Sequence, residues 1–181
     1  KSDKIVISQK CVRWSGLDIS PARFIDPKSL ENYEKIRFLK DGDILWNSTG
    51  TGTIGRASLF FQIDTYQNIV ADSHVTVVRT LGNISDYIYL VIRSPYIQKD
   101  LESSASGTTN QIELNTSTVL QTRIPLPPIE EQKRIVAKVD ELMQLCDQLE
   151  QQQNLSSEAH DKLVDTLLNV LINSSDVDEF Q

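Results

Sequence analysis

The chain has 181 residues, a formal net charge of −7 and an apolar fraction of 39%, which fits one domain with or without a helical appendage. We expect no membrane span and no secretory signal, and the two distant cysteines, Cys11 and Cys146, exclude a disulfide framework and a cysteine metal site. The acidity also disfavours nucleic-acid binding if the charge is evenly distributed.

Residues 1–124 are predicted to form short strands separated by turns, followed by helices. The patterns predict strands over 4–8, 43–46, 56–63 and 75–79, helices over 85–94, 95–103 and 114–120, and a closing strand over 121–124. Asn115 is the expected cap of the last helix. This mixture is typical of a small α+β domain.

Composition and charge both change at the proline-rich segment 123–129. All seven glycines precede residue 108, and neither glycine nor proline follows Pro128. Residues 1–124 carry 14 basic and 13 acidic side chains, whereas residues 125–181 carry 4 and 12, so the net charges are +1 and −8. Two parts with different electrostatics predict two functions. We therefore divide the chain into a domain over 1–124 and a stiff junction with a helical region over 125–181.

The acidic part carries the apolar spacing of a coiled coil. Its seam, with spacings of 4, 3, 4 and 3, is formed by Ile135, Val139, Leu142, Cys146 and Leu149. A second periodic run follows a polar run, and its packing residues include Leu163, Leu167 and Val170. The polar run 151–157 predicts a break between two helices of unequal length. Neither helix can bury its stripe alone, so we expect pairing with each other, with the first part or with another chain.

A glycine-rich segment, Gly50-Thr-Gly-Thr-Ile-Gly55, has the spacing of a dinucleotide-binding fingerprint, and Asp72 lies where a ribose-binding acid is expected. That fingerprint requires a helix after the glycines, whereas residues 56–63 read as a strand. A hairpin loop, a nucleotide site and a loop that approaches DNA closely all remain open.

The other candidate features contain no complete catalytic or metal-binding set. His74 has no partner at metal or triad spacing, and His160 falls on a polar helix face. We therefore predict no catalytic residues and no metal site. The polar segment 103–111 is either a solvated loop or a surface whose side chains hydrogen-bond to phosphates and base edges.

The junction provides a resemblance to a known family. It reads Ile124-Pro-Leu-Pro-Pro-Ile-Glu-Glu-Gln-Lys-Arg-Ile-Val136 and continues Ala-Lys-Val-Asp-Glu-Leu-Met-Gln-Leu-Cys-Asp-Gln-Leu149. This sequence resembles the point in specificity (S) subunits of type I restriction–modification systems where a target recognition domain meets a conserved spacer helix. Gly42-Asp-Ile-Leu45 and Gly107-Thr-Thr-Asn-Gln111 are similar to segments within such recognition domains.

The resemblance implies a non-catalytic protein of the bacterial or archaeal cytoplasm that reads double-stranded DNA. Residues 1–124 would be a target recognition domain for one half of a bipartite site, and the helices would dock methyltransferase (M) subunits, joined by a restriction (R) subunit. S-adenosylmethionine, ATP and Mg would bind only to those partners. A single recognition domain implies a fragment, or a half-sized subunit that forms a homodimer through its helices.

Three sets of polar side chains are the expected DNA contacts under this resemblance. They are Arg13 and Arg23; Asn47, Thr49, Thr51 and Arg56; and Ser106, Thr108, Thr109, Asn110 and Gln111. A domain of charge +1 should bind DNA weakly by itself, because neutralisation of phosphates supplies much of the affinity. A homodimeric coiled-coil adaptor without DNA binding and a nucleotide-dependent enzyme remain the alternatives.

Overall fold

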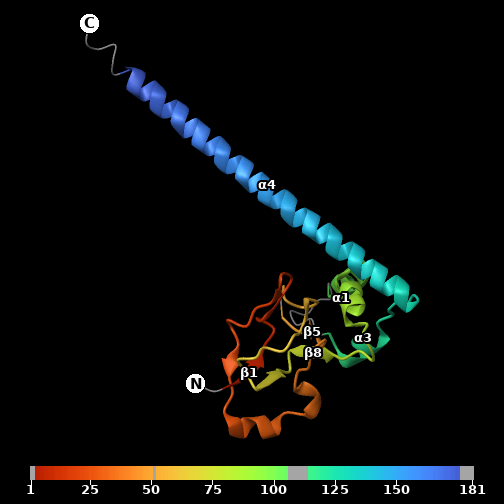
Figure 1. Cartoon of the computed structure of the whole chain (residues 1–181). Coiled ribbons are helices and arrows are strands. Elements are labelled where there is room, and N and C mark those ends of the chain that lie inside the picture. The colour runs from red at the N-terminus through yellow and green to blue at the C-terminus, as the bar shows by residue number, and fades with distance from the viewer. Residues whose placement is uncertain (1–2, 51, 106–113, 176–181) are drawn as a thin grey trace. The chain divides into compact units, whose positions relative to one another are not determined.

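The computed structural model describes residues 3–50, 52–105 and 114–175 and divides the chain into two compact units, Lys1–Val136 (unit 1) and Ala137–Gln181 (unit 2). Unit 1 contains short strands, two 3-10 helices (η1, η2) and three α-helices, in the order that Figure 1 shows. The bounds are β1 Lys4–Ile7, β2 Val12–Arg13, β3 Gly16–Leu17, β4 Arg23–Phe24, η1 Pro27–Asn32, η2 Lys35–Arg37, β5 Ile44–Asn47, β6 Ala57–Leu59, β7 Asn68–Ala71, β8 Val75–Val78, α1 Ser85–Arg93, α2 Pro95–Ala105, α3 Thr116–Gln121 and α4 Ile129–Ser175.

Two three-stranded sheets form the framework of unit 1. In the first, β1 lies between β4, to which it is antiparallel, and β7, to which it is parallel. In the second, β5 pairs antiparallel with both β6 and β8. The apolar runs of β1 and β5 are buried along almost their whole length, which is expected for strands covered on both faces. This arrangement brings the ends of β1, β5 and β7 into one region.

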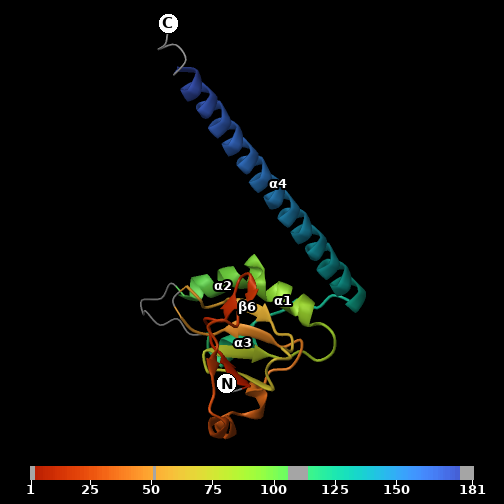
Figure 2. The ribbon, with the colours of Figure 1, turned by 60° about the vertical axis from the view of Figure 1, so that its left-hand side comes forward.

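Helix α1 covers one face of the second sheet, and α2 follows it along the same side of unit 1 (Figure 2). Tyr87, Ile88, Val91 and Ile92 of α1 are buried against Trp46 and its neighbours. Their spacing places them on one helix face. Ser94 ends α1 immediately before Pro95, the first residue of α2, because the residue before a proline disfavours helical dihedrals.

The proline connector is fastened to unit 1 by two side chains. The Tyr87 hydroxyl donates a hydrogen bond to the Pro125 carbonyl at 2.9 Å, and Gln132 Nε2 donates to the Pro127 carbonyl at 2.8 Å. The first turns of α4 also belong to unit 1, since Ile135 and Val136 pack against its core. The compact unit therefore extends to Val136, beyond the division at residue 124 that composition suggests.

Helix α4 is continuous from Ile129 to Ser175. The predicted break at residues 151–157 is wrong, because that run contains neither glycine nor proline and its glutamines are good helix formers. The two apolar segments also share one seam: after Leu149, the 4-3 spacing runs through Gln153, Ser156 and His160 and reaches Leu163. A polar stretch thus interrupts the stripe without interrupting the helix.

Other predictions are confirmed or corrected by the structure. The α+β class is confirmed, as are the predicted strands that became β1, β5 and β8 and the helices α1, α2 and α3. The predicted strand over 121–124 is wrong, because residue 121 ends α3 and the following residues pair with no strand. Asn115 occupies the N-cap position of α3, but its side chain makes no capping hydrogen bond. Strand β6 is shorter than the predicted 56–63.

Candidate nucleic-acid interface

The glycine-rich loop between β5 and β6 is held from beneath by Asn47. Asn47 is fully buried, and its Nδ2 donates to the carbonyls of Gln9 at 3.0 Å and Thr53 at 3.2 Å. Its backbone carbonyl also accepts a hydrogen bond from the Gly55 N–H at 3.0 Å. Because Asn47 has no exposed surface, we reassign it from DNA contact to positioning of the loop.

Threonine hydroxyls and Gln9 close the same loop. Thr53 Oγ1 donates to the carbonyls of Thr49 at 3.1 Å and Gly50 at 3.2 Å. Thr49 Oγ1 donates to Gln9 Oε1 at 3.2 Å. Gly50 has a positive φ of 102°, and a Cβ atom there would collide with Thr53 Oγ1 and Gln9 Oε1. The loop therefore presents closely packed backbone, as a surface that approaches a ligand requires.

The turn between β7 and β8 is joined to this loop. His74 Nδ1 lies 2.9 Å from Thr49 Oγ1, and the His74 carbonyl accepts a hydrogen bond from the Ser48 N–H at 3.0 Å. Arg37 Nη1 supports the turn from η2 by donating to the carbonyls of Asp72 at 3.0 Å and Val75 at 2.7 Å. Sequence reasoning tested His74 only for metal and catalytic roles and so missed its place here.

Positive charge gathers around this turn. Burial raises the pKa of Asp72, while the hydrogen bond from the His74 backbone and the nearby charges of His74, Arg23 and Arg37 act in the opposite direction. Arg23, an exposed residue of β4, therefore lies within electrostatic reach of the turn. The structure therefore places this predicted contact near the β7–β8 turn.

Arg13 and Arg56 are already engaged within the protein. Arg56 Nη2 donates to the Gly52 carbonyl at 2.6 Å, so its guanidinium folds back on its own loop. Arg13 forms an exposed ion pair of 2.9 Å with Asp18. The adjacent β2–β3 turn is held by Arg93 of α1, which donates to the Trp14 carbonyl at 2.7 Å and stacks over the Trp14 ring at 5.8 Å.

The second predicted loop falls outside the described residues. Thr51 and the set Ser106, Thr108, Thr109, Asn110 and Gln111 all lie there. The chain on both sides of that gap is fastened to the Gly-rich loop: Gln98 Nε2 donates to the Gly55 carbonyl at 3.0 Å, and the Leu114 N–H donates to the Ser48 carbonyl at 2.7 Å. The flanks of the two predicted loops are therefore neighbours.

The structure does not favour a nucleotide site at the glycines. The loop runs into strand β6, so it lacks the helix N-terminus that holds a pyrophosphate. Among the described residues, no group of three or more His, Cys, Asp and Glu side chains is placed to hold a metal ion. Within the same ranges, no helix combines the length and the apolarity needed to cross a membrane.

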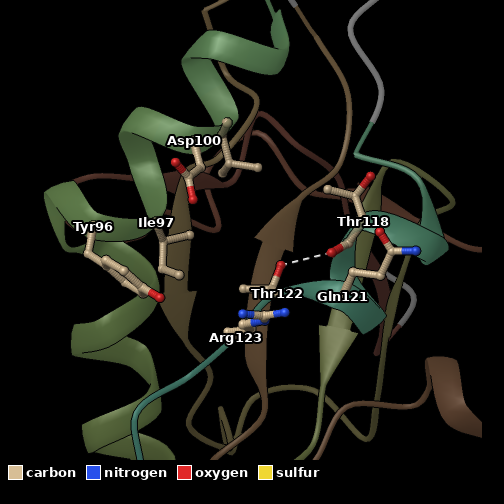
Figure 3. Close-up of a pocket in the computed structure, with 8 residues that line it drawn as sticks. Tyr96, Ile97, Asp100, Thr118, Gln121, Thr122 and Arg123 are labelled. Carbon is tan, nitrogen blue, oxygen red and sulfur yellow. Dashed lines mark hydrogen bonds between the residues drawn. The ribbon is translucent and has the colours of Figure 1, made fainter.

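A half-open pocket of about 420 Å³ lies between α2 and α3. Figure 3 shows Tyr96, Ile97 and Asp100 on the α2 side and Thr118, Gln121 and Thr122 on the α3 side, where Thr122 Oγ1 donates to the Thr118 carbonyl at 2.8 Å. The described residues that line it include no His or Cys and none of the expected DNA contacts.

The predicted helix-packing residues have two environments. Ile135 packs on the core of unit 1, and Val139 is half-buried. The other members of the seam, Leu142, Cys146, Leu149, Leu163, Leu167 and Val170, are exposed. Within the described chain, unit 2 is therefore a single amphipathic helix with an uncovered apolar stripe. A lone helix gains little stability without such packing, which indicates a partner.

Comparisons with known proteins agree with this organisation. A family model described as the type I restriction modification DNA specificity domain matches residues 12–157. The EcoAI specificity subunit of Escherichia coli is 38% identical over 112 residues, which are 61% of this chain and 19% of that subunit. The EcoEI specificity subunit, also from Escherichia coli, is 44% identical over 93 residues, 51% of this chain and 16% of that subunit. The chain spans less than a fifth of the length of these two relatives.

The fold has a counterpart in a structure that describes complex assembly and conformational transition of the type I R–M system. It matches with a TM-score of 0.66 and 23% identity, over 91% of this chain and 42% of the other. This likeness concerns the fold, whereas the family match concerns the sequence. Because that match covers well over half of the residues, the chain belongs to the family of type I restriction–modification DNA specificity domains.

Proposed function

We propose that this chain reads one half of a bipartite site in double-stranded DNA, as a non-catalytic specificity component of a type I restriction–modification complex. One observation carries the proposal: in a chain of this family, the loops after β1, β5 and β7 are joined by hydrogen bonds into one polar surface. Exposed or half-buried threonine, histidine and arginine side chains on such a surface suit contacts with phosphates and base edges.

The charge distribution supports weak binding by the chain alone and tight binding in a complex. The domain over 1–124 carries only +1, and phosphate neutralisation supplies much of DNA affinity. We therefore expect methyltransferase subunits to add positive surface, with the restriction subunit completing the complex in the cytoplasm. S-adenosylmethionine, ATP and Mg would bind to those partners only.

Helix α4 is the proposed docking element for the methyltransferase subunits. Its uncovered seam provides apolar area, and its net acidic surface complements a basic partner. The unbroken seam also suits a second copy of the same helix, because two chains can bury matching apolar segments. We propose homodimerisation through α4 as the second role of this surface.

Selection from a random double-stranded DNA library tests the proposal. The chain with a type I methyltransferase subunit should enrich one short sequence, whereas the chain alone should bind weakly and with a steep dependence on salt. A ternary complex without sequence preference would reject DNA reading. That outcome, together with a stable dimer in sedimentation, would favour the homodimeric adaptor.

A matched pair of variants tests docking. Leu142→Glu places a charge on the exposed seam, whereas Gln144→Glu places the same charge on the opposite helix face. Only Leu142→Glu should abolish assembly with a methyltransferase subunit or with a second copy. If both variants assemble normally, the seam is not the docking surface.

A further inference from the structure

His74 combines an exposed position with a fixed orientation. Its carbonyl accepts from the Ser48 N–H at 3.0 Å, its backbone N–H donates to Asp72 Oδ1 at 2.9 Å, and its Nδ1 lies 2.9 Å from Thr49 Oγ1. Exposed histidines are usually mobile, whereas three contacts define this one. The arrangement joins the β7–β8 turn to the Gly-rich loop.

The two ring nitrogens of His74 have different surroundings. Nδ1 is engaged within the protein, because it shares a hydrogen bond of 2.9 Å with Thr49 Oγ1. When the Thr49 hydroxyl donates to Nδ1, Nε2 carries the ring proton and can donate it to a ligand. Nε2 takes no part in the contacts between the turn and the Gly-rich loop.

The surroundings of the imidazole favour an anion. The charged and titratable groups near it are Arg23 of β4, Arg37 of η2 and the half-buried Asp72. Asp72 faces the backbone of the turn, because its Oδ1 accepts a hydrogen bond from the His74 N–H. Two arginines thus accompany one carboxylate near the turn.

We propose that the β7–β8 turn is part of the DNA interface and that His74 Nε2 holds a backbone phosphate beside the Gly-rich loop. This inference rests on the proposed function and extends it to a residue outside the predicted contacts. A phosphate suits the site better than a base edge, because phosphates are the usual partners of clustered cationic side chains on DNA-binding proteins. Such a contact fixes the orientation of the protein on the duplex and carries no sequence information.

A contact to phosphate affects every duplex alike, because phosphates carry no sequence information. Loss of the Nε2 donor should therefore lower the affinity for all sequences by a similar factor.

Three variants separate contact from positioning. His74→Asn keeps a donor near the Nδ1 position and removes the atom at Nε2, whereas His74→Gln reaches the Nε2 position with an uncharged donor. Gln144→Asn, on the exposed face of α4 opposite the seam, is the control for a substitution outside the proposed interface. Binding to the duplex selected by the wild-type complex, and to a generic duplex, is measured at one pH and one salt concentration.

His74→Asn should weaken binding to all duplexes by about tenfold, with the selected sequence unchanged. His74→Gln should retain most of the affinity, and Gln144→Asn should match the wild type. Wild-type affinity of His74→Asn would overturn the inference, as would a changed sequence preference. A wild-type complex that selects no sequence rejects the proposed function instead, while the affinity for the generic duplex still tests His74.

Discussion

The Asp43–Arg79 pair is the most buried charged contact among the described residues. Arg79 Nε and Nη2 donate to the two Asp43 oxygens at 2.7 and 2.6 Å, and the Lys40 N–H donates to Oδ2 at 2.8 Å. The Asp43 side chain is 1% exposed, and its hydrogen bonds raise the pKa of Arg79. The pair ties the start of β5 to the end of β8, at the end of these strands away from the loops of the interface.

Arg79→Ala should lower the free energy of unfolding by about 3 kcal/mol, because removal of the arginine leaves the buried Asp43 carboxylate without its counterion. Urea denaturation measures the change. Asp18→Asn removes the exposed partner of Arg13 and should leave the midpoint nearly unchanged, since exposed ion pairs contribute little. Equal effects of the two variants would contradict a structural role for the buried pair.

The stability of the fold should depend on pH through Asp72, with a sign opposite to that of a salt-bridged carboxylate. Burial raises its pKa from the ordinary 3.8, so the folded state holds the proton more tightly than the unfolded state. The charged carboxylate therefore destabilises the fold above its folded pKa, and this penalty disappears as the pH falls toward 3.8.

Asp72→Asn should raise the thermal midpoint at pH 7 and leave it unchanged near pH 3, while the amide oxygen keeps the hydrogen bond from the His74 N–H. The variant also removes a negative charge from the proposed interface, so DNA affinity at pH 7 should rise. Calorimetry across pH and a DNA titration check both effects. If the variant is stabilised more at low pH than at pH 7, the pKa of Asp72 is not raised in the folded state.

At the scale of elements, the Gly-rich loop depends on Gly50 more than on Gly52. Both have positive φ, but a Cβ at Gly50 would meet Thr53 and Gln9, whereas nothing lies within 4 Å of a Cβ at Gly52. Gly50→Ala should therefore shift the loop and reduce sequence-specific DNA binding strongly. Gly52→Ala should lower stability by about 1 kcal/mol and retain most of the binding. Parallel titrations on the selected duplex decide the comparison.

Sequence patterns predicted the elements whose own residues show a clear hydrophobic pattern. The buried run of β1 and the single apolar face of α1 were recognisable because each has one clear period. Strands β2, β3 and β4 were missed because two residues carry no period, and they exist only through their partners. The polar run in α4 was misread because polarity was given more weight than helix propensity.

The sequence predicted which loops form the candidate site, but it did not predict the role of each residue in them. The glycines marked the loop after β5, and the polar composition marked the loop after α2. Burial of Asn47 and the contact between Thr49 and His74 depend on tertiary pairings across about 25 to 40 residues, which local patterns do not record. His74 was therefore dismissed although it lies at the centre of the assembled surface.

At the scale of the whole molecule, the fastened connector lies between the proposed DNA-reading domain and the proposed docking helix. Exchange of residues 1–124 for another recognition domain, with 125–181 retained, should change the methylated sequence and leave partner assembly intact. The incoming domain must supply a tyrosine equivalent to Tyr87, because its hydroxyl holds the Pro125 carbonyl. Mapping of methylated adenines checks the change of sequence, and a pull-down of the methyltransferase subunit checks partner assembly. Loss of assembly would show that docking depends on residues 1–124.

The net charge of −7 averages two different surfaces. The acidic excess belongs to the segment that forms the connector and α4, and the domain with the loop cluster is nearly neutral. An acidic isoelectric point is therefore compatible with DNA reading when another subunit supplies the cationic surface.

Cys146 makes the seam of α4 responsive to oxidation. It is exposed, while Cys11 is buried, so a mild oxidant should reach only the thiol on α4. In a parallel, in-register pair of helices, two Cys146 thiols would face each other and cross-link. An antiparallel pair that sets the polar stretch against itself would place Cys146 opposite Leu163 of a second copy, where no disulfide can form. Non-reducing electrophoresis of the oxidised chain therefore reports the direction in which two copies align.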